Sequence, residues 1–446
     1  MESPTRVAGA TARLLIITAL TIAANIVVIG QNGHQGNGQN KGNDKEKILY
    51  VWAQDQAHVA PDFLAVIDLN ERSARYGSVI RTVPIPPPGN IGNEPHHCHL
   101  NSTKTILGCG GLLSVLSGQN GIFFFDVTSA ANPKFLFSTQ ALNSSITDDF
   151  LPLENGGFLV TQMGSANGTS PGRVAEFDDR LRFVGNHFGS TSVLAEWPLL
   201  PPLDGFNPHG ISARPDLNVM MTADFIEPAS TLVGSAGPVL RNTVRVWDYR
   251  ARRITKTVEL KQPDGSPALG IMDVRMLPRD ARGYGYAAGM FDGFIYLIDP
   301  VSGTAVPAFD CDTVVPHVET PVRGGMGQIM ATPQSGDRLI FSLFQAGQVG
   351  MLDTTDRGNL RQLSVVSYGK DTGPHNLLLS DDDTRLVVSD YFLNEDNAGI
   401  IHFEGDHKIH VIKVGRNTLE DDPQFQLDFN TAFATGPARP HGIAMK

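Results

Sequence analysis

The sequence predicts an all-β protein folded as a seven-bladed β-propeller. Three observations predict it: a strand motif that recurs along the chain, breaks rich in Gly, Pro, Asn and Asp between the strands, and incomplete motifs at both ends. A large β-sandwich or a two-domain β-protein is the alternative, and a regular repeat fits it poorly. The recurring motif is an alternating apolar run that ends in Asp, or in Lys in the last copy: Phe63–Asp68, Gly121–Asp126, Arg173–Asp178, Thr243–Asp248, Phe294–Asp299, Gln348–Asp353 and Lys408–Lys413.

The two ends of the chain complement each other. Ile48–Trp52 takes the place of a second strand, so the first blade lacks its innermost strand. His441–Met445 resembles an innermost strand with nothing after it. Pairing of the C-terminal strand with the N-terminal blade would close the ring and cover both open edges. We therefore expect the propeller to occupy residues 48–446.

The N-terminal region is expected to lie outside the propeller. Arg6 and Arg13 flank an apolar run, Leu14–Gly30, so residues 1–30 form a signal peptide or a signal anchor, with cleavage favoured. Residues 31–47 are a polar, glycine-rich flexible linker. This predicts a secreted or lumenal protein whose only membrane contact is a possible N-terminal anchor. Three glycosylation sequons, which would make the product a glycoprotein, agree with that route: Asn101, Asn143 and Asn167.

Composition excludes several function classes. The chain has 446 residues, a net charge of −11 and no basic run, so we expect no nucleic-acid partner. It has no glycine-rich phosphate loop and no Gly-x-Ser-x-Gly motif, so any catalysis would depend on a metal. Cys98 and Cys109 fall on neighbouring strands and could pair, leaving Cys311 over; Cys98 could also face the channel. An ordinary buried Cys98 is the favoured interpretation.

The dipeptide Pro-His recurs at equivalent points of four repeats. Each copy opens an innermost strand, and those strands surround one mouth of a propeller channel, so their imidazoles would converge. Neutral imidazoles suit copper or iron, and zinc less, so one transition-metal ion is expected. In the first blade a slip of register would bring His97 or His99 inward instead. The alternative is turn chemistry alone. The predicted ligands are His96, His209, His375 and His441.

Other side chains are expected around the same mouth. The remaining blades carry Asp148, Asp273 and Gln328 near the start of their innermost strands, and these, with Asp224, are the candidate catalytic groups. His97 and Asp224 are expected to lie behind the ligands. His317 is out of frame. An apolar pocket for a small-molecule substrate is expected from Phe206, Phe225, Tyr391 and Phe392.

Several segments resemble one family. Pro61–Leu69, Ser73–Pro86 and Glu94–His97 resemble the opening blade of selenium-binding proteins, which include methanethiol oxidases, and Val219–Phe225 and Asn242–Ile254 are similar to its middle blades. The resemblance implies a seven-bladed propeller and, for the oxidase members, copper-dependent oxidation of a small thiol. The paired histidines of the family match His96 and His97, and Asp224 stands where the family has an acidic residue. The family's cysteine pair and second-blade histidine cluster are missing, so selenium binding and methanethiol itself are not implied.

The expected function is a metal-dependent oxidoreductase that acts on a small organic substrate at the histidine-lined channel. One alternative is a metal-dependent lyase or isomerase, or a C–C cleaving oxygenase, because a four-histidine site on a propeller is similar to that of the carotenoid-cleavage oxygenases. The other is a non-catalytic binding module whose histidines are structural.

Overall fold

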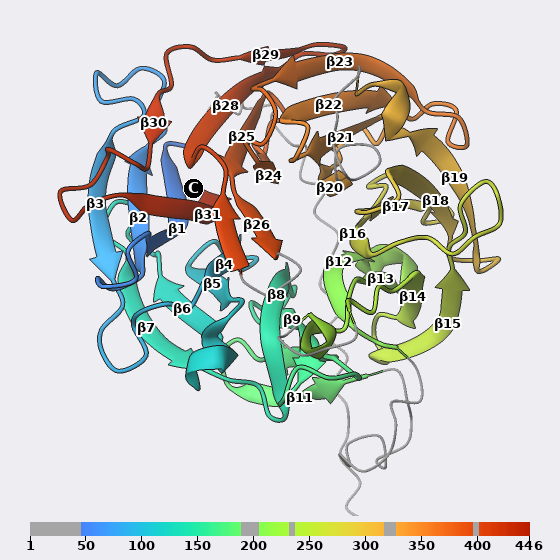
Figure 1. Ribbon diagram of the computed structural model, residues 1–446, viewed down its shortest axis with the longest axis horizontal. Coiled ribbons are helices and arrows are strands. Elements are labelled where there is room, and N and C mark those ends of the chain that lie inside the picture. The colour runs from blue at the N-terminus through green and yellow to red at the C-terminus, as the bar shows by residue number, and fades with distance from the viewer. Residues whose placement is uncertain (1–45, 189–204, 232–236, 316–326, 396–400) are drawn as a thin grey trace, which may run out of the picture. The chain divides into compact units, whose positions relative to one another are not determined.

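The computed structural model describes residues 46–188, 205–231, 237–315, 327–395 and 401–446. In these residues the chain forms seven antiparallel sheets arranged in a ring, which confirms the predicted propeller (Figure 1). The expected signal peptide and nearly all of the linker lie outside the described residues and stay predictions, as does the placement of His317. No helix within the described part of the chain has the length and apolar character needed to cross a membrane.

The innermost strands surround the axis of the ring (Figure 1). They are β31 (Ala438–Met445), β4 (Pro95–Leu100), β8 (Ser144–Pro152), β12 (Pro208–Arg214), β16 (Ile271–Met276), β20 (Gly327–Ala331) and β24 (Pro374–Leu379). The second strands are β1 (Ile48–Asp55), β5 (Ile106–Gly111), β9 (Phe158–Ser165), β13 (Val219–Asp224), β17 (Gly285–Gly289), β21 (Arg338–Leu343) and β25 (Arg385–Asp390).

The recurring apolar motif of the sequence is the third strand. These strands are β2 (Phe63–Asp68), β6 (Ile122–Asp126), β10 (Arg173–Phe177), β14 (Thr243–Asp248), β18 (Phe294–Asp299), β22 (Gln348–Asp353) and β28 (Lys408–Val414). The outer strands are β3 (Val79–Pro84), β7 (Lys134–Thr139), β11 (Phe183–His187), β15 (Arg253–Glu259), β19 (Thr304–Asp310), β23 (Arg361–Ser367), β29 (Leu419–Asp421) and β30 (Leu427–Asp428). Second and third strands are covered by neighbouring blades on both faces, which explains their nearly continuous apolar sequences.

Few elements lie outside this pattern. A hairpin of β26 (Phe392–Glu395) and β27 (Ile401–Glu404) is inserted between β25 and β28 of the last blade. Among the residues that the structure describes, the helical segments are single 3-10 turns: η1 (Ser114–Ser117), η3 (Pro215–Leu217), η4 (Pro228–Ser230) and η5 (Cys311–Thr313).

The C-terminal strand closes the ring as predicted. β31 pairs antiparallel with β1, with Met445 opposite Leu49 and Ile443 opposite Val51, and the two strands lie side by side (Figure 1). Aromatic residues fill the neighbouring core, where the Trp52 and Phe123 ring centroids are 5.2 Å apart. The last residues of the chain therefore complete the first blade.

A β-bulge marks the start of the innermost strands. Pairing with the second strand shifts register between Pro95 and Cys98 in β4, and between Pro208 and Ile211 in β12. Similar shifts occur in β8, β16, β20 and β24, and in the pairing of β1 with β31. A bulge places two residues opposite one and re-aims a side chain, so strict alternation between faces fails at this mouth of the channel.

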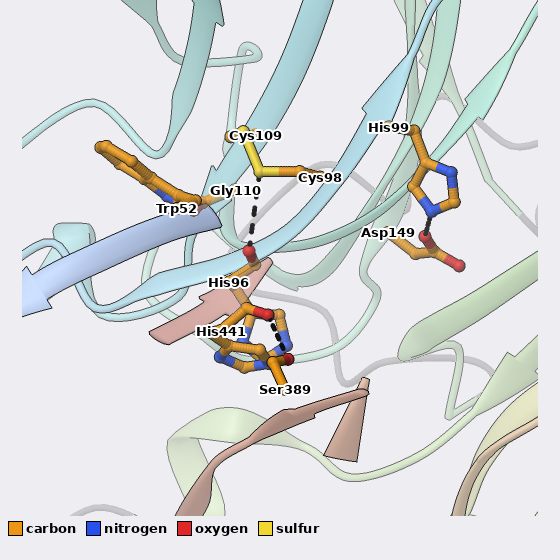
Figure 2. Close-up of a disulfide and its surroundings, with 9 residues drawn as sticks. All are labelled: Trp52, His96, Cys98, His99, Cys109, Gly110, Asp149, Ser389 and His441. Carbon is orange, nitrogen blue, oxygen red and sulfur yellow. Dashed lines mark hydrogen bonds and ion pairs between the residues drawn. A yellow bond between two sulfur atoms is a disulfide. The ribbon is translucent and has the colours of Figure 1, made fainter. Parts of the chain in front are cut away.

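A disulfide joins Cys98 of β4 to Cys109 of β5, as Figure 2 shows. The favoured interpretation of Cys98 as an ordinary buried thiol was wrong, because the two residues stand directly opposite one another in the strand pair. Cys311 is buried and is not part of a disulfide.

Candidate metal centre

Five histidines from four innermost strands converge at one mouth of the channel. His96 and His97 come from β4, and His209, His375 and His441 come from β12, β24 and β31. All five are at most 3% exposed. Their ring centroids are 4.1 Å apart for His96 and His441 and 6.3 Å apart for His96 and His375. The structure therefore brings together the four predicted ligands and adds His97.

The bulge of β4 explains why two consecutive histidines face the same centre. The rings of His96 and His97 stack with centroids 4.4 Å apart. Ligand atoms of His96, His97 and His441 all lie within 4.8 Å of one another. His97 is therefore itself a candidate metal ligand, rather than a residue that lies behind the ligands. His99, the other alternative, points elsewhere: its Nε2 atom lies 2.9 Å from Asp149 Oδ1 (Figure 2).

Hydroxyl groups of the preceding blade hold three of the histidine backbones. Thr161 Oγ1 donates to the carbonyl of His209 at 2.7 Å, and Ser342 Oγ donates to that of His375 at 3.1 Å. Ser389 Oγ donates to the carbonyl of His441 in the same way, as Figure 2 shows. Each hydroxyl is on a second strand, so each of these three blades positions a histidine of the next one.

The glycines that follow His209 and His441 allow close packing between blades. A Cβ atom on Gly442 would lie 2.1 Å from the carbonyl oxygen of His96, and one on Gly210 would lie 2.6 Å from Asp273 Oδ1. The first contact is with backbone and cannot be relieved by a side-chain rotation. The glycines of the Pro-His-Gly pattern thus allow neighbouring blades to approach closely.

Asp148 is the carboxylate of the cluster. Its side chain on β8 is fully buried, with Oδ2 at 3.0 Å from His209 Nε2 and 3.2 Å from His96 Nε2, and Oδ1 at 3.1 Å from His97 Nδ1. Burial alone would raise the pKa of Asp148, but the adjacent His209 and His96 outweigh burial and hold that pKa well below its usual range. A buried anion therefore lies beside the imidazoles.

Three of the imidazoles, those of His96, His375 and His441, favour the neutral form. Burial, opposed by Asp148, lowers the pKa of His96 to about 4. Burial, reinforced by the neighbouring histidines, holds the pKa values of His375 and His441 well below the usual range. Both ring nitrogens of His441, and Nδ1 of His96, are buried without a hydrogen-bond partner. Buried nitrogens with free lone pairs are the donors that a transition-metal ion requires.

The spacing of the nitrogens also fits a metal ion. The Nε2 atoms of His97 and His375 are 3.4 Å apart. Two nitrogens at roughly 2.0–2.1 Å from one tetrahedral ion would be separated by about 3.3 Å. The residues present therefore fit a single transition-metal ion.

The other predicted polar residues have different partners. The carboxylate of Asp224 accepts from the backbone N–H of Asn207 at 2.9 Å and from Arg245 Nε at 2.6 Å, so its link to His209 runs through the backbone. Asp273 accepts from the backbone N–H of Met330 at 2.8 Å and lies 3.2 Å from Arg275 Nε. Gln328 is on β20, and its side chain lies outside the described residues.

Aromatic side chains line the mouth around the histidines. Tyr391 stacks on His441 with ring centroids 3.9 Å apart, and Phe225 lies 5.2 Å from His209. Phe392 packs on Phe344, whose ring is 6.1 Å from His375. Phe206 was wrongly expected in this pocket. It is fully buried and packs against Trp247 in the core between blades, away from the histidine cluster.

Sequence reasoning missed the role of Glu94. This carboxylate is buried beside the Tyr391 hydroxyl, and burial raises its pKa to about 7. Its Oε2 atom lies 3.8 Å from Arg439 Nη2. The sequence feature that could have indicated Glu94 is its position directly before Pro95-His96, where the bulge of β4 begins.

Comparisons with known proteins agree with the family resemblance. The chain is 25% identical to a methanethiol oxidase of Hyphomicrobium sp over 274 residues, which is 57% of this chain and 56% of that protein. It is 23% identical to the methanethiol oxidase of Danio rerio over 343 residues, covering 69% and 68% of the two chains. It is 30% identical to selenium-binding protein 3 of Arabidopsis thaliana over 144 residues, or 29% of each chain. The first of these matches thus spans little more than half of its relative, and no family model matches the chain.

Solved structures share the fold. A hypothetical selenium-binding protein from Sulfolobus tokodaii superposes with a TM-score of 0.72 and 17% identity, covering 91% of this chain and 94% of the other. A putative 6-phosphogluconolactonase from Bacteroides uniformis gives a TM-score of 0.58 at 10% identity, covering 91% of this chain and 100% of the other. The predicted resemblance to selenium-binding proteins and methanethiol oxidases is therefore confirmed.

Proposed function

We propose that this chain is a metal-dependent oxidoreductase that oxidises a small organic substrate, with a small thiol as the first candidate. The observation that carries the proposal is the set of five buried imidazoles around one buried carboxylate, where four of the imidazoles have a ring nitrogen without a hydrogen-bond partner. A purely structural histidine would be expected to satisfy its ring nitrogens. The names of the relatives, methanethiol oxidases, support the class of reaction.

The metal is proposed to be copper or iron, held by His97, His375, His96 and His441. The Nε2 atoms of His97 and His375 are 3.4 Å apart, and ligand atoms of His96, His97 and His441 lie within 4.8 Å of one another. In this arrangement His209 and Asp148 lie behind the ligands, with Asp148 orienting the rings of His96, His97 and His209. Bound copper or iron would supply electron transfer between substrate and an acceptor such as O₂.

The residues of the mouth prepare the site for a small apolar substrate. Phe225, Phe344 and Phe392 form an apolar cluster with Met272 and Met290 next to His209 and His375. Such a wall excludes water and leaves the histidine face as the polar part of the pocket. Glu94 and the Tyr391 hydroxyl lie beside that face and are placed to hold or move a proton.

The proposal is tested by O₂ uptake. Protein loaded with copper or iron is incubated with methanethiol, longer alkanethiols and matched alcohols, while an oxygen electrode records consumption. We expect uptake with at least one thiol, and loss of that uptake in His375→Ala. If metal-loaded protein consumes no O₂ with any of these compounds, the oxidase assignment fails and a binding module becomes the better account.

We also propose that the protein works in the secretory pathway or outside the cell. The disulfide between Cys98 and Cys109 supports this, because disulfides persist in oxidising compartments. Asn143 and Asn167 are exposed and available to a glycan, whereas Asn101 is buried with its amide bonded to Gly156. Mass spectrometry of the mature protein should find residues 1–30 removed or retained in a membrane fraction. An intact N-terminus on soluble cytosolic protein would contradict the proposal.

A further inference from the structure

A second cluster of metal-binding side chains lies outside the central site, in the last blade. Asp390 ends β25, Asp406 precedes β28, and His410 is on β28. Ligand atoms of these three residues lie within 4.8 Å of one another. None of the three contributes to the central histidine cluster, so the group calls for a separate explanation.

Two carboxylates of this cluster face each other without a donor between them. Asp390 is fully buried, yet its Oδ1 atom has no hydrogen-bond partner, and neither has the buried Oδ1 atom of Asp406. Burial, with a contribution from Asp406, raises the pKa of Asp390 to about 8. Two adjacent carboxylates are unstable as a pair of anions unless a proton or a cation lies between them.

The third group is an imidazole that is held in position from two sides. His410 Nε2 lies 2.8 Å from Asp390 Oδ2. The ring of Tyr368 stacks on His410 with centroids 3.8 Å apart, and the Tyr368 hydroxyl donates to Asp421 at 2.9 Å. This fixes the plane of the imidazole, so Nε2 stays directed at the carboxylates.

The cluster lies close to the protein surface. The side chains of Asp406 and His410 are 25% and 15% exposed, while that of Asp390 is fully buried. Lys408 Nζ binds Asp406 through Oδ2 at 2.7 Å and leaves Oδ1 free. An ion bound by Asp406 Oδ1 would therefore not need to displace Lys408.

We propose that Asp390, Asp406 and His410 form a second cation site, which binds a divalent ion that accepts mixed oxygen and nitrogen ligands. Zn²⁺ and Mn²⁺ fit such a set, whereas Ca²⁺ and Mg²⁺ prefer oxygen ligands alone. Two carboxylates balance the charge of the ion, and its binding displaces the proton that the cluster otherwise holds.

The position of the cluster gives the ion a structural role. Asp390 lies just before the inserted β26–β27 hairpin, and Asp406 lies just after it. Tyr391, which stacks on His441, directly follows Asp390. A cation bound by both Asp390 and Asp406 would fix the two ends of the hairpin. It would also hold Tyr391 in place over the central site.

Zinc titration of the metal-free full-length chain against a chromophoric chelator tests the site. The intact protein should bind two Zn²⁺ ions per chain, one at each site. Asp406→Asn, Asp390→Asn and His410→Ala should each bind one, and Glu420→Gln, which removes an exposed acid outside the cluster, should bind two. His375→Ala should also bind one, and its combination with Asp406→Asn should bind none.

The variants separate the two sites. If Asp406→Asn and His410→Ala both bind as much zinc as the intact protein, the second site does not exist and the cluster holds only a proton. If instead His375→Ala equals the intact protein while Asp406→Asn loses its ion, the central site fails and the second stands. Because Asp406 and His410 are partly exposed, these two variants test the site even where Asp390→Asn does not fold.

Discussion

The Nε2 atoms of His97 and His375 lie 3.4 Å apart, although the residues are separated by 278 positions in the sequence. Both rings are buried, and such a nitrogen pair requires a proton or a metal ion between its members. Closure of the ring produces this contact. β31 packs between β24 of the last blade and β4 of the second blade, and so brings His375 and His97 together. The candidate metal centre therefore depends on the architecture of the whole propeller.

Gly442→Ala should weaken both the fold and metal binding. The new Cβ atom would lie 2.1 Å from the His96 carbonyl oxygen and must push β31 away from β4. Overpacking of this kind costs about 1–3 kcal/mol in the free energy of unfolding. Urea unfolding measures the effect, and Gly185→Ala, where a Cβ meets nothing within 4 Å, is the control. Equal losses in the two variants would contradict close packing of the blades at this point.

Ser342→Ala should loosen the backbone of His375. Removal of the buried hydroxyl leaves the His375 carbonyl without its donor and costs about 1–2 kcal/mol in unfolding free energy. Metal affinity should also fall, by about tenfold, because the ligand strand is less well positioned. Ser302→Ala removes an exposed hydroxyl and should change neither quantity. A Ser342→Ala protein with unchanged stability and affinity would show that the hydroxyl plays no part.

Deletion of residues 439–446 should abolish cooperative unfolding. The deletion removes most of β31, so β1 loses its partner and the ring opens. The His441→Ala protein, which lacks the imidazole but keeps the strand, should still unfold cooperatively. Thermal melts followed by circular dichroism compare the two. A truncated protein that melts like the full-length chain would disprove the role of closure.

Asp148→Asn and Asp224→Asn should impair different properties of the protein. The first removes the anion that orients three imidazoles, so metal affinity should fall by about 10–100-fold while the fold is kept. The second breaks a buried ion pair with Arg245 and should cost about 3–5 kcal/mol of stability. Chelator competition and urea unfolding measure the two properties on each variant. If Asp224→Asn lost metal more severely than Asp148→Asn, the assignment of Asp148 would be wrong.

Much of the architecture could be predicted from periodicity. Strands that are buried on both faces repeat as apolar runs, and the unmatched strands at the two ends, Ile48–Trp52 and His441–Met445, indicated closure. The convergence of His96, His209, His375 and His441 followed from their common position in the repeat. These features depend on residue type and spacing, which the sequence displays directly.

The details of the site depend on backbone irregularities that the sequence does not display. The bulge in β4 turns both His96 and His97 inward, whereas regular alternation predicts that only one of them faces the channel. The pairing of Cys98 with Cys109 depended on strand register, which spacing alone did not determine. The direction of Phe206 also could not be read from its position before a Pro-His pair, since it packs on Trp247.

Metal content measured by plasma mass spectrometry tests the central claim most directly. The full-length protein and two variants, His375→Ala and His187→Ala, all carrying Asp406→Asn to remove the second cation site, are loaded with copper or iron and passed over a chelating resin. The account predicts one ion per chain in the intact protein and in His187→Ala, whose imidazole lies on outer strand β11 beside Glu176. It predicts loss of the ion in His375→Ala. Full metal content in His375→Ala, or no retained metal in the intact protein, would contradict a metal centre at the mouth of this propeller.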